Sequence, residues 1–280
     1  MGSSEVMDFN RYGCTPPRST AQRPLRAARV RLALLACGWL GVALAARADN
    51  PGYDRPGYGF TPVVLGAGEV TLEQGLADWS RDRQGGISSS LYSADSLLRL
   101  GLGGPLELQL GGSLYNYLHQ TGAGLDYRSH GRGDTHLALK LALPSSHAAF
   151  SWGLLGSVEF TDGAPDFRNN RRQYLLGAQF NLQAGRRHSL GAYLEDVRSG
   201  GRDSRTLALS DSYSCSKSLM VYAETVLLQL PGRGHGSLAG AGLAWLVTPR
   251  WQFDLGFDRR LSGSAPPWQA NLGVSVYFGH

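Results

Sequence analysis

The stretch Trp251-Gln-Phe-Asp-Leu-Gly-Phe-Asp258 alternates large apolar residues with small or polar ones. A period of two places the apolar side chains on one face of a β-strand and the others on the opposite face. The same alternation recurs in residues 134–143, 148–160 and 268–278. The face opposite the apolar residues carries Gly, Ser, Asn, Gln and scattered carboxylates, which is typical of a crowded polar lumen.

Alternating segments of about ten residues have the length that tilted strands need to cross a bilayer. We expect strands at residues 69–79, 91–102, 105–117, 134–143, 148–160, 173–184, 189–197, 205–214, 219–230, 237–247, 251–261 and 268–278. Short joins alternate with longer ones, at 80–90, 118–133, 161–172, 198–204, 231–236 and 262–267. Bacterial barrels place their short turns in the periplasm. The sequence therefore predicts an all-β fold, a transmembrane antiparallel up-and-down β-barrel of about twelve strands over residues 69–280. A soluble sandwich, which also alternates, is the alternative.

The N-terminal region has the parts of a signal peptide. Arginines precede the apolar run from Leu32 to Ala46, and an A-x-A site ends at Ala48. The run is shorter than the roughly 20 residues of a transmembrane helix. We expect residues 1–48 to be a signal peptide with a long extension, cleaved near Ala48, and residues 49–68 to be a periplasmic segment. Lipidation of Cys37 is the alternative.

The charge distribution gives no evidence of a polyanion partner. The whole chain has a formal charge of +5, and residues 1–48 carry that excess in seven arginines against Glu5 and Asp8. Residues 49–280 are neutral, so we expect no nucleic acid. Only Cys215 remains after cleavage, which excludes an intrachain disulfide. No residue cluster has metal-ligand spacing, and we expect neither metal nor cofactor.

Two groups of residues follow from the strand faces. Charged and imidazole side chains on the polar face are candidates for lining the lumen: Glu73, Arg99, Glu107, His136, Lys140, Glu159, Glu195, Glu224, Asp254, Asp258 and Arg260. Aromatic residues near the strand ends are candidates for the membrane girdle: Trp152, Trp245, Trp251, Trp268 and Phe278. The acidic excess predicts a pore for cations or neutral solutes, or a network of ion pairs that fills a narrow barrel. Loops 118–133 or 161–172 could fold inward.

Several blocks resemble one outer-membrane family. They are Asp54-Arg-Pro-Gly-Tyr-Gly-Phe-Thr-Pro62, Leu98-Arg-Leu-Gly-Leu102 with Leu106-Glu-Leu108, and Gly133-Asp134 with Lys140. Together they look like the family associated with the meta pathway of phenol degradation, whose members are called transporters. The resemblance covers most of residues 54–278 and implies a barrel for small, aromatic or hydrophobic compounds. Residues 271–278 also resemble the terminal signal that the barrel-assembly machinery recognises.

These observations favour a channel in the bacterial outer membrane that passes a small-molecule solute and is no enzyme. Its other expected partners are the barrel-assembly machinery and the outer-membrane lipids, including lipopolysaccharide. One alternative is a barrel enzyme acting on lipid, in which Asp134 would orient His136, although no nucleophile motif accompanies them. The other alternative is a structural or surface-interaction barrel with a sealed lumen.

Overall fold

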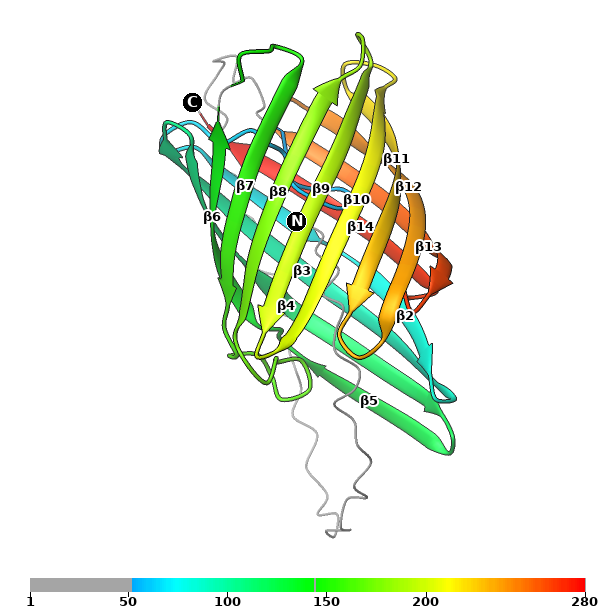
Figure 1. The fold of residues 1–280 in the computed structure, drawn as a ribbon. Coiled ribbons are helices and arrows are strands. Elements are labelled where there is room, and N and C mark those ends of the chain that lie inside the picture. The colour runs from blue at the N-terminus through cyan, green and yellow to red at the C-terminus, as the bar shows by residue number, and fades with distance from the viewer. Residues whose placement is uncertain (1–51, 144, 280) are drawn as a thin grey trace. The chain divides into compact units, whose positions relative to one another are not determined.

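The computed structural model describes residues 52–143 and 145–279, which form β-strands and their connections (Figure 1). The strands are β1 (Val70–Gly75), β2 (Asp78–Gln84), β3 (Ile87–Gly103), β4 (Leu106–Gly122), β5 (Leu125–Gly131), β6 (Thr135–Leu143), β7 (Phe150–Glu159), β8 (Gln173–Gln183), β9 (His188–Ser199), β10 (Arg202–Ser214), β11 (Leu219–Leu230), β12 (Gly234–Thr248), β13 (Trp251–Gly263) and β14 (Trp268–Phe278). None of the described residues forms a helix long and apolar enough to cross a membrane. The expected signal peptide and its cleavage site at Ala48 lie outside the described residues.

The strands form one closed antiparallel barrel with twelve strand positions. Both β1 and β2 lie between β3 and β14, so they are two parts of one position. Leu76 and Ala77 separate them, and both amides donate to the Leu272 carbonyl, at 2.8 and 3.4 Å. Likewise, β5 and β6 both pair with β4. The pairing of β1 with β14 closes the barrel, which confirms the predicted fold.

The alternation in sequence becomes an alternation in burial. Along β13, Trp251, Phe253, Leu255 and Phe257 are exposed, whereas the residues between them are buried. A soluble protein of this kind would leave a large apolar surface in water. The arrangement instead suits a barrel whose outer surface contacts lipid and whose lumen holds the polar side chains.

Two of the predicted long loops are mainly continuations of strands. Residues 80–84 and 87–90 extend β2 and β3, and residues 118–131 form the end of β4 and all of β5. The loop expectation was wrong here, because strand pairing continues beyond the apolar band. The hairpin of β4 and β5 projects past the other strands in Figure 1.

One connection, residues 160–172 between β7 and β8, is a true long loop. The carboxylate of Asp134 accepts hydrogen bonds from the amides of Gly163 (2.8 Å) and Asn169 (2.5 Å). Asp134 precedes β6 on the same face as the buried Ala138 and Lys140. The loop is therefore held against the lumen side of the barrel wall.

Candidate functional site: the barrel lumen

Residues 52–66 lie inside the barrel, whereas residues 49–68 were predicted to form a periplasmic segment. Tyr53, Phe60 and Leu65 in this segment are all 7% exposed or less. Its polar groups bond to lumen-facing side chains from many parts of the wall. We call residues 52–66 the lumen segment. Its position follows from chemistry: the wall presents buried charges that need partners, and the segment supplies them.

Asp54 anchors the lumen segment in a cluster of buried charges. Arg99 Nη1 lies 2.9 Å from Glu73 Oε1, and Arg99 Nε lies 2.8 Å from Glu107 Oε1. Lys140 Nζ lies 2.9 Å from Glu107 Oε1 and 3.2 Å from Asp54 Oδ1. The side chains of all five residues are fully buried. We call Asp54, Glu73, Arg99, Glu107 and Lys140 the five-residue charge cluster.

The charge cluster has three carboxylates for two cations, and backbone amides help to stabilise the remaining negative charge. The amides of Asp54 and Arg55 donate to the two oxygens of Glu73, at 3.0 and 2.9 Å. Burial opposes ionisation of Asp54, but Arg99 and Lys140 outweigh it and hold the pKa of Asp54 well below its ordinary value. Asp54 is therefore a buried anion fixed between two cations.

Arg55, the next residue of the lumen segment, bonds to β2 and β13, the two strands that pair with β14 on either side. Its guanidinium donates two parallel hydrogen bonds to the Asp78 carboxylate, at 3.0 and 3.1 Å, and its Nε lies 3.2 Å from Asp254 Oδ1. Gln252 Nε2 donates to the Arg55 carbonyl at 3.0 Å. A bidentate guanidinium–carboxylate pair is geometrically specific and strong. Arg55 therefore ties the segment to β2 and β13.

Residues 57–60 carry the segment across to β8–β11. The Tyr58 amide donates to Glu224 Oε2 at 3.0 Å. The Phe60 ring meets Tyr193 edge to face, with centroids 5.9 Å apart. Gly59 has φ +99°, and a Cβ atom there would collide with Gln179 Oε1. Only glycine tolerates this backbone conformation and this close approach.

The predicted lumen residues fall into three groups by burial. Buried on the inner face are Glu73, Arg99, Glu107, Lys140, Glu224, Asp254 and Asp258. Half-buried are His136, Glu159 and Glu195. Arg260 is exposed near the rim that holds the long loop, where its Nη1 donates to the Ala265 carbonyl at 3.2 Å. The charge cluster joins four of these residues, whereas Glu195, Glu224 and Asp258 lie across the lumen on β9, β11 and β13.

The structure does not support the expected pair of Asp134 and His136. Asp134 is occupied by the loop amides of Gly163 and Asn169. His136 faces Gly111 of β4, and its buried Nε2 has no hydrogen-bond partner among the described residues. His136 is thus a packed wall residue rather than part of a dyad.

The predicted girdle aromatics lie on the outer face. Trp245, Trp251 and Phe278 are 49%, 47% and 55% exposed. Trp152 and Trp268 are half-buried, and Trp268 stacks under the Arg259 guanidinium at 4.9 Å. Rings at both strand ends suit the two interfacial zones of a bilayer.

Asp54 and Arg55 were not among the residues predicted to line the lumen. Residues 52–66 contain four glycines and two prolines among other residues and do not alternate, so no strand pattern drew attention to them. A signal was present nevertheless. The predicted lumen face held far more carboxylates than cations, and buried charges need partners. Arg55 carries the positive charge that a buried carboxylate needs as a partner.

The closed wall, the lipid-facing apolar surface and the polar lumen together define an outer-membrane β-barrel. The chain belongs to the family described as "Putative MetA-pathway of phenol degradation", whose model matches residues 53–278. The match begins at the lumen segment and ends at the last residue of β14. Comparison with curated protein sequences finds no match.

Two solved structures show the same fold. An outer membrane channel from Pseudomonas putida F1 is 16% identical, with a TM-score of 0.57, over 77% of this chain and 97% of that one. The KdgM porin is 10% identical, with a TM-score of 0.50, over 75% of this chain and 99% of that one. At these identities the likeness concerns the fold.

Proposed function

We propose that this protein is an outer-membrane channel for small molecules whose lumen is narrowed by residues 52–66. The observation that carries the proposal is the attachment of the lumen segment. It is held by specific polar contacts to β1, β2, β3, β4, β6, β11 and β13 rather than by a continuous apolar core. Such contacts fix a short segment while leaving polar groups along the lumen.

The lining favours neutral or cationic aromatic solutes. Four rings lie inside the barrel near Glu224: Tyr58 is half-buried, and Phe60, Tyr193 and Tyr222 are buried behind it. Ring faces attract cations and stack with other aromatic groups, and carboxylates repel anions. The family description, which refers to phenol degradation, points to the same solute class.

The test is the conductance of planar bilayers containing the refolded protein. We expect a small conductance from the wild type and a larger one when residues 52–66 are replaced by a Gly-Ser linker. The linker keeps the chain length but removes every side chain of the lumen segment. The matched control replaces residues 160–172 in the same way, which leaves the charge cluster intact.

Two readouts accompany the conductance measurement. A heat-dependent shift in gel mobility verifies that each variant forms a barrel. Swelling of liposomes in a small phenolic solute then measures passage of the proposed substrate class. If bilayers stay insulating with both the wild type and the linker variant at high protein loading, the barrel is sealed and the channel proposal fails.

We also propose that residues 1–48 are removed near Ala48 on export, and that the barrel-assembly machinery recognises β14. The leader pattern and the Asn271–Phe278 ending support this route. The mass of the protein isolated from outer membranes tests it. A mature chain beginning at Asp49 is expected, and a lipidated Cys37 would overturn the assignment.

A further inference from the structure

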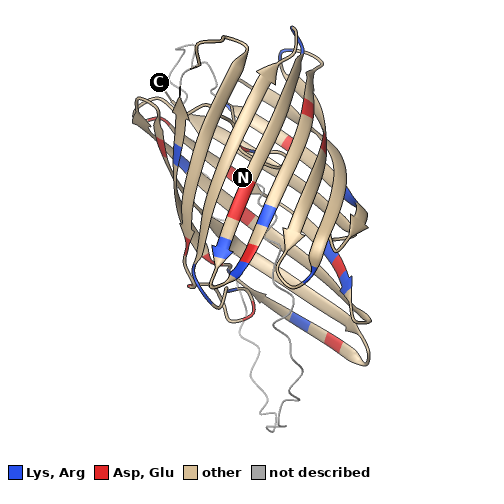
Figure 2. Ribbon diagram, viewed as in Figure 1, with Lys and Arg blue, Asp and Glu red and all other residues tan. Residues whose placement is uncertain are grey.

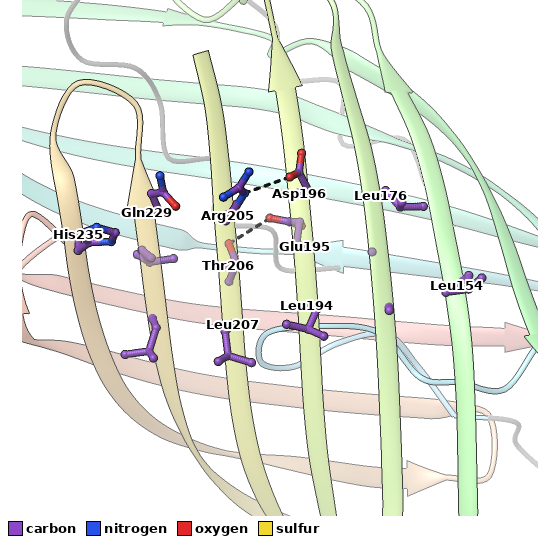
Figure 3. Close-up of a pocket in the computed structure, with 14 residues that line it drawn as sticks. Leu154, Leu176, Leu194, Glu195, Asp196, Arg205, Thr206, Leu207, Gln229 and His235 are labelled. Carbon is purple, nitrogen blue, oxygen red and sulfur yellow. Dashed lines mark hydrogen bonds and ion pairs between the residues drawn. The ribbon is translucent and has the colours of Figure 1, made fainter. Parts of the chain in front are cut away.

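A groove crosses the outer surface of the barrel over β7 to β12 (Figure 3). Its volume is about 460 Å³. The lower row of its lining is apolar and is brought together by strand register: Leu154 is opposite Ala178, which is opposite Leu194, followed by Leu207 and Leu227. Ala178 is the small residue in a row of leucines, so the surface is hollowed at β8.

The row next to it along the strands is polar. It consists of four residues that are neighbours in register, Asp196, Arg205, Gln229 and His235. This row lies two residues along the strands from the leucine row, toward the rim that holds loop 160–172. Arg205 Nε lies 3.2 Å from Asp196 Oδ2, as Figure 3 shows. Arg198, a further step toward the rim, lies 3.3 Å from Asp196 Oδ1. The Asp196 carboxylate therefore pairs with two guanidiniums, and the side chains of Arg198 and Arg205 remain largely exposed.

The rim beside the groove has an excess of positive charge. Five arginines lie at this rim: Arg171 and Arg172 at the end of loop 160–172, and Arg198, Arg202 and Arg205 on β9 and β10. Their neighbours on the outer face include two aspartates, Asp196 and Asp203. Figure 2 shows blue and red segments close together on β9 and β10. The Arg171 side chain lies beside Gly200, in the turn between those strands.

The position of the groove limits what can occupy it. It opens on the lipid-facing side, where Leu176, Leu194 and Leu227 are 64%, 48% and 50% exposed. Bacterial barrels direct their longer loops outward and their short turns to the periplasm. On that rule the groove lies where the apolar part of the outer leaflet meets its headgroups. A ligand there needs an apolar chain next to an anionic group.

We propose that this groove binds lipopolysaccharide, the phosphorylated and acylated glycolipid of the outer leaflet. One acyl chain lies along the leucine row over Ala178. A phosphate accepts charge-assisted hydrogen bonds from Arg205 and Arg198, in competition with Asp196. The net positive charge of the rim favours this lipid over a zwitterionic phospholipid. The proposal goes beyond passage through the lumen and does not depend on it.

The experiment titrates the refolded, lipid-free protein in detergent micelles with purified lipopolysaccharide and follows binding by the change in intrinsic tryptophan fluorescence. Arg198→Gln with Arg205→Gln should weaken binding about tenfold, because two charge-assisted contacts are lost. Ala178→Phe should weaken it by about as much, because the ring fills the hollow without changing charge.

Each variant has a matched control at a comparable site. Arg83→Gln removes an exposed outward arginine near the same rim, on β2. Ala192→Phe adds a ring to the outer face of β9, one register step beyond the leucine row. Both controls should bind as the wild type does. Gel mobility before and after heating verifies the barrel in every variant.

Three results would overturn the proposal. They are wild-type affinity in both groove variants, equal losses in the two controls, and binding of phosphatidylcholine or phosphatidylglycerol that matches binding of lipopolysaccharide. The last result would assign the groove to phospholipid. Because the readout is binding, failure of the channel proposal would leave these outcomes unchanged.

Discussion

Asp54, in the lumen segment, belongs to a network of ion pairs that connects four strands of the wall. It contacts Arg99 of β3 and Lys140 of β6, and these in turn contact Glu73 of β1 and Glu107 of β4. Buried ion pairs contribute little net stability when intact, but removing one partner leaves an uncompensated buried charge. The cluster therefore acts mainly to specify where the lumen segment lies.

Asp54→Asn should release the lumen segment and destabilise the barrel. Glu73 and Glu107 still balance Arg99 and Lys140, so the cost is that of the hydrogen bonds that the Asp54 carboxylate accepts from Lys140, Gln109 and Thr61, about 1–3 kcal/mol. We expect a higher conductance in bilayers and a lower temperature for the gel-mobility transition. Asp203→Asn, at an exposed position of β10, is the control and should change neither. An unchanged transition in Asp54→Asn would show that the cluster does not hold the segment.

The low pKa of Asp54 predicts how the segment responds to acid. Because Arg99 and Lys140 lower its pKa in the folded state, its contribution to stability is full above the unfolded pKa of about 3.9 and disappears as pH falls through the folded value. The Thr61 amide donates to Asp54 Oδ1 at 2.9 Å. Hydrogen exchange at Thr61, corrected for its intrinsic rate, should therefore be equally protected at pH 7 and pH 5. Loss of protection at pH 5 would contradict the assigned ionisation.

Residue types in the wall could be assigned to faces from sequence, and most of the predicted charged residues are indeed buried on the inner face. Their partners could not be assigned. Glu73 receives two backbone amides from a segment that shows no periodicity. Contacts of this kind depend on the path of an irregular chain, which hydropathy does not encode.

At the scale of elements, strand existence was predictable and strand length was not. Residues within the apolar band alternate because one face meets lipid and the other the lumen. Beyond the apolar band both faces of a strand meet water, so apolar and polar residues no longer alternate there. The stretch Arg81–Arg83 and the stretch Ser88–Ser90 pair as strands without this alternation. The break between β1 and β2 at Leu76 likewise has no signature in the alternation.

The lumen segment as an element depends on glycine at the point of closest approach to the wall. In Gly59→Ala the new methyl group would meet Gln179 and Tyr193, in addition to straining the backbone at φ +99°. Strain of this kind costs on the order of 1–3 kcal/mol. We expect faster proteolysis within residues 52–66 and a higher conductance.

Gly124→Ala is the control for a methyl group added at a positive φ outside the lumen segment. Gly124 has φ +78°, and a Cβ atom there would meet nothing within 4 Å. Alanine at this position adds conformational strain without a collision. The position is in the turn between β4 and β5, far along the chain from the lumen segment. Both effects should be absent in this control. Equal proteolysis within residues 52–66 in the two variants would show that the effect is not specific to position 59.

For the whole molecule, the distribution of charge predicts ion selectivity. Lumen carboxylates across from the charge cluster accept hydrogen bonds from neutral donors: Glu195 from Tyr193 and Thr206, and Glu224 from the Tyr58 amide. A surplus of negative groups in a narrow lumen favours cations. The reversal potential under a salt gradient should have the sign of cation selectivity.

Glu195→Gln with Glu224→Gln should reduce that selectivity while keeping the size of both side chains. Asp211→Asn, which removes an exposed acid of β10, is the control and should leave the reversal potential unchanged. Anion selectivity in the wild type would mean that the surplus is neutralised by protonation or by bound cations.

The route of the lumen segment also constrains how the chain folds. The bonds that hold it join residues far apart in sequence: the Tyr53 hydroxyl to the Arg250 carbonyl across 197 positions, and the Tyr58 hydroxyl to Gln269 across 211. These contacts can form only when the last strands arrive. Non-local contacts of this kind make folding slow. Residues 52–66 precede β1, so they are enclosed as β14 reaches β1. Closure of the wall and filling of its interior are therefore one late event, and assembly need never expose the membrane to an unobstructed hole.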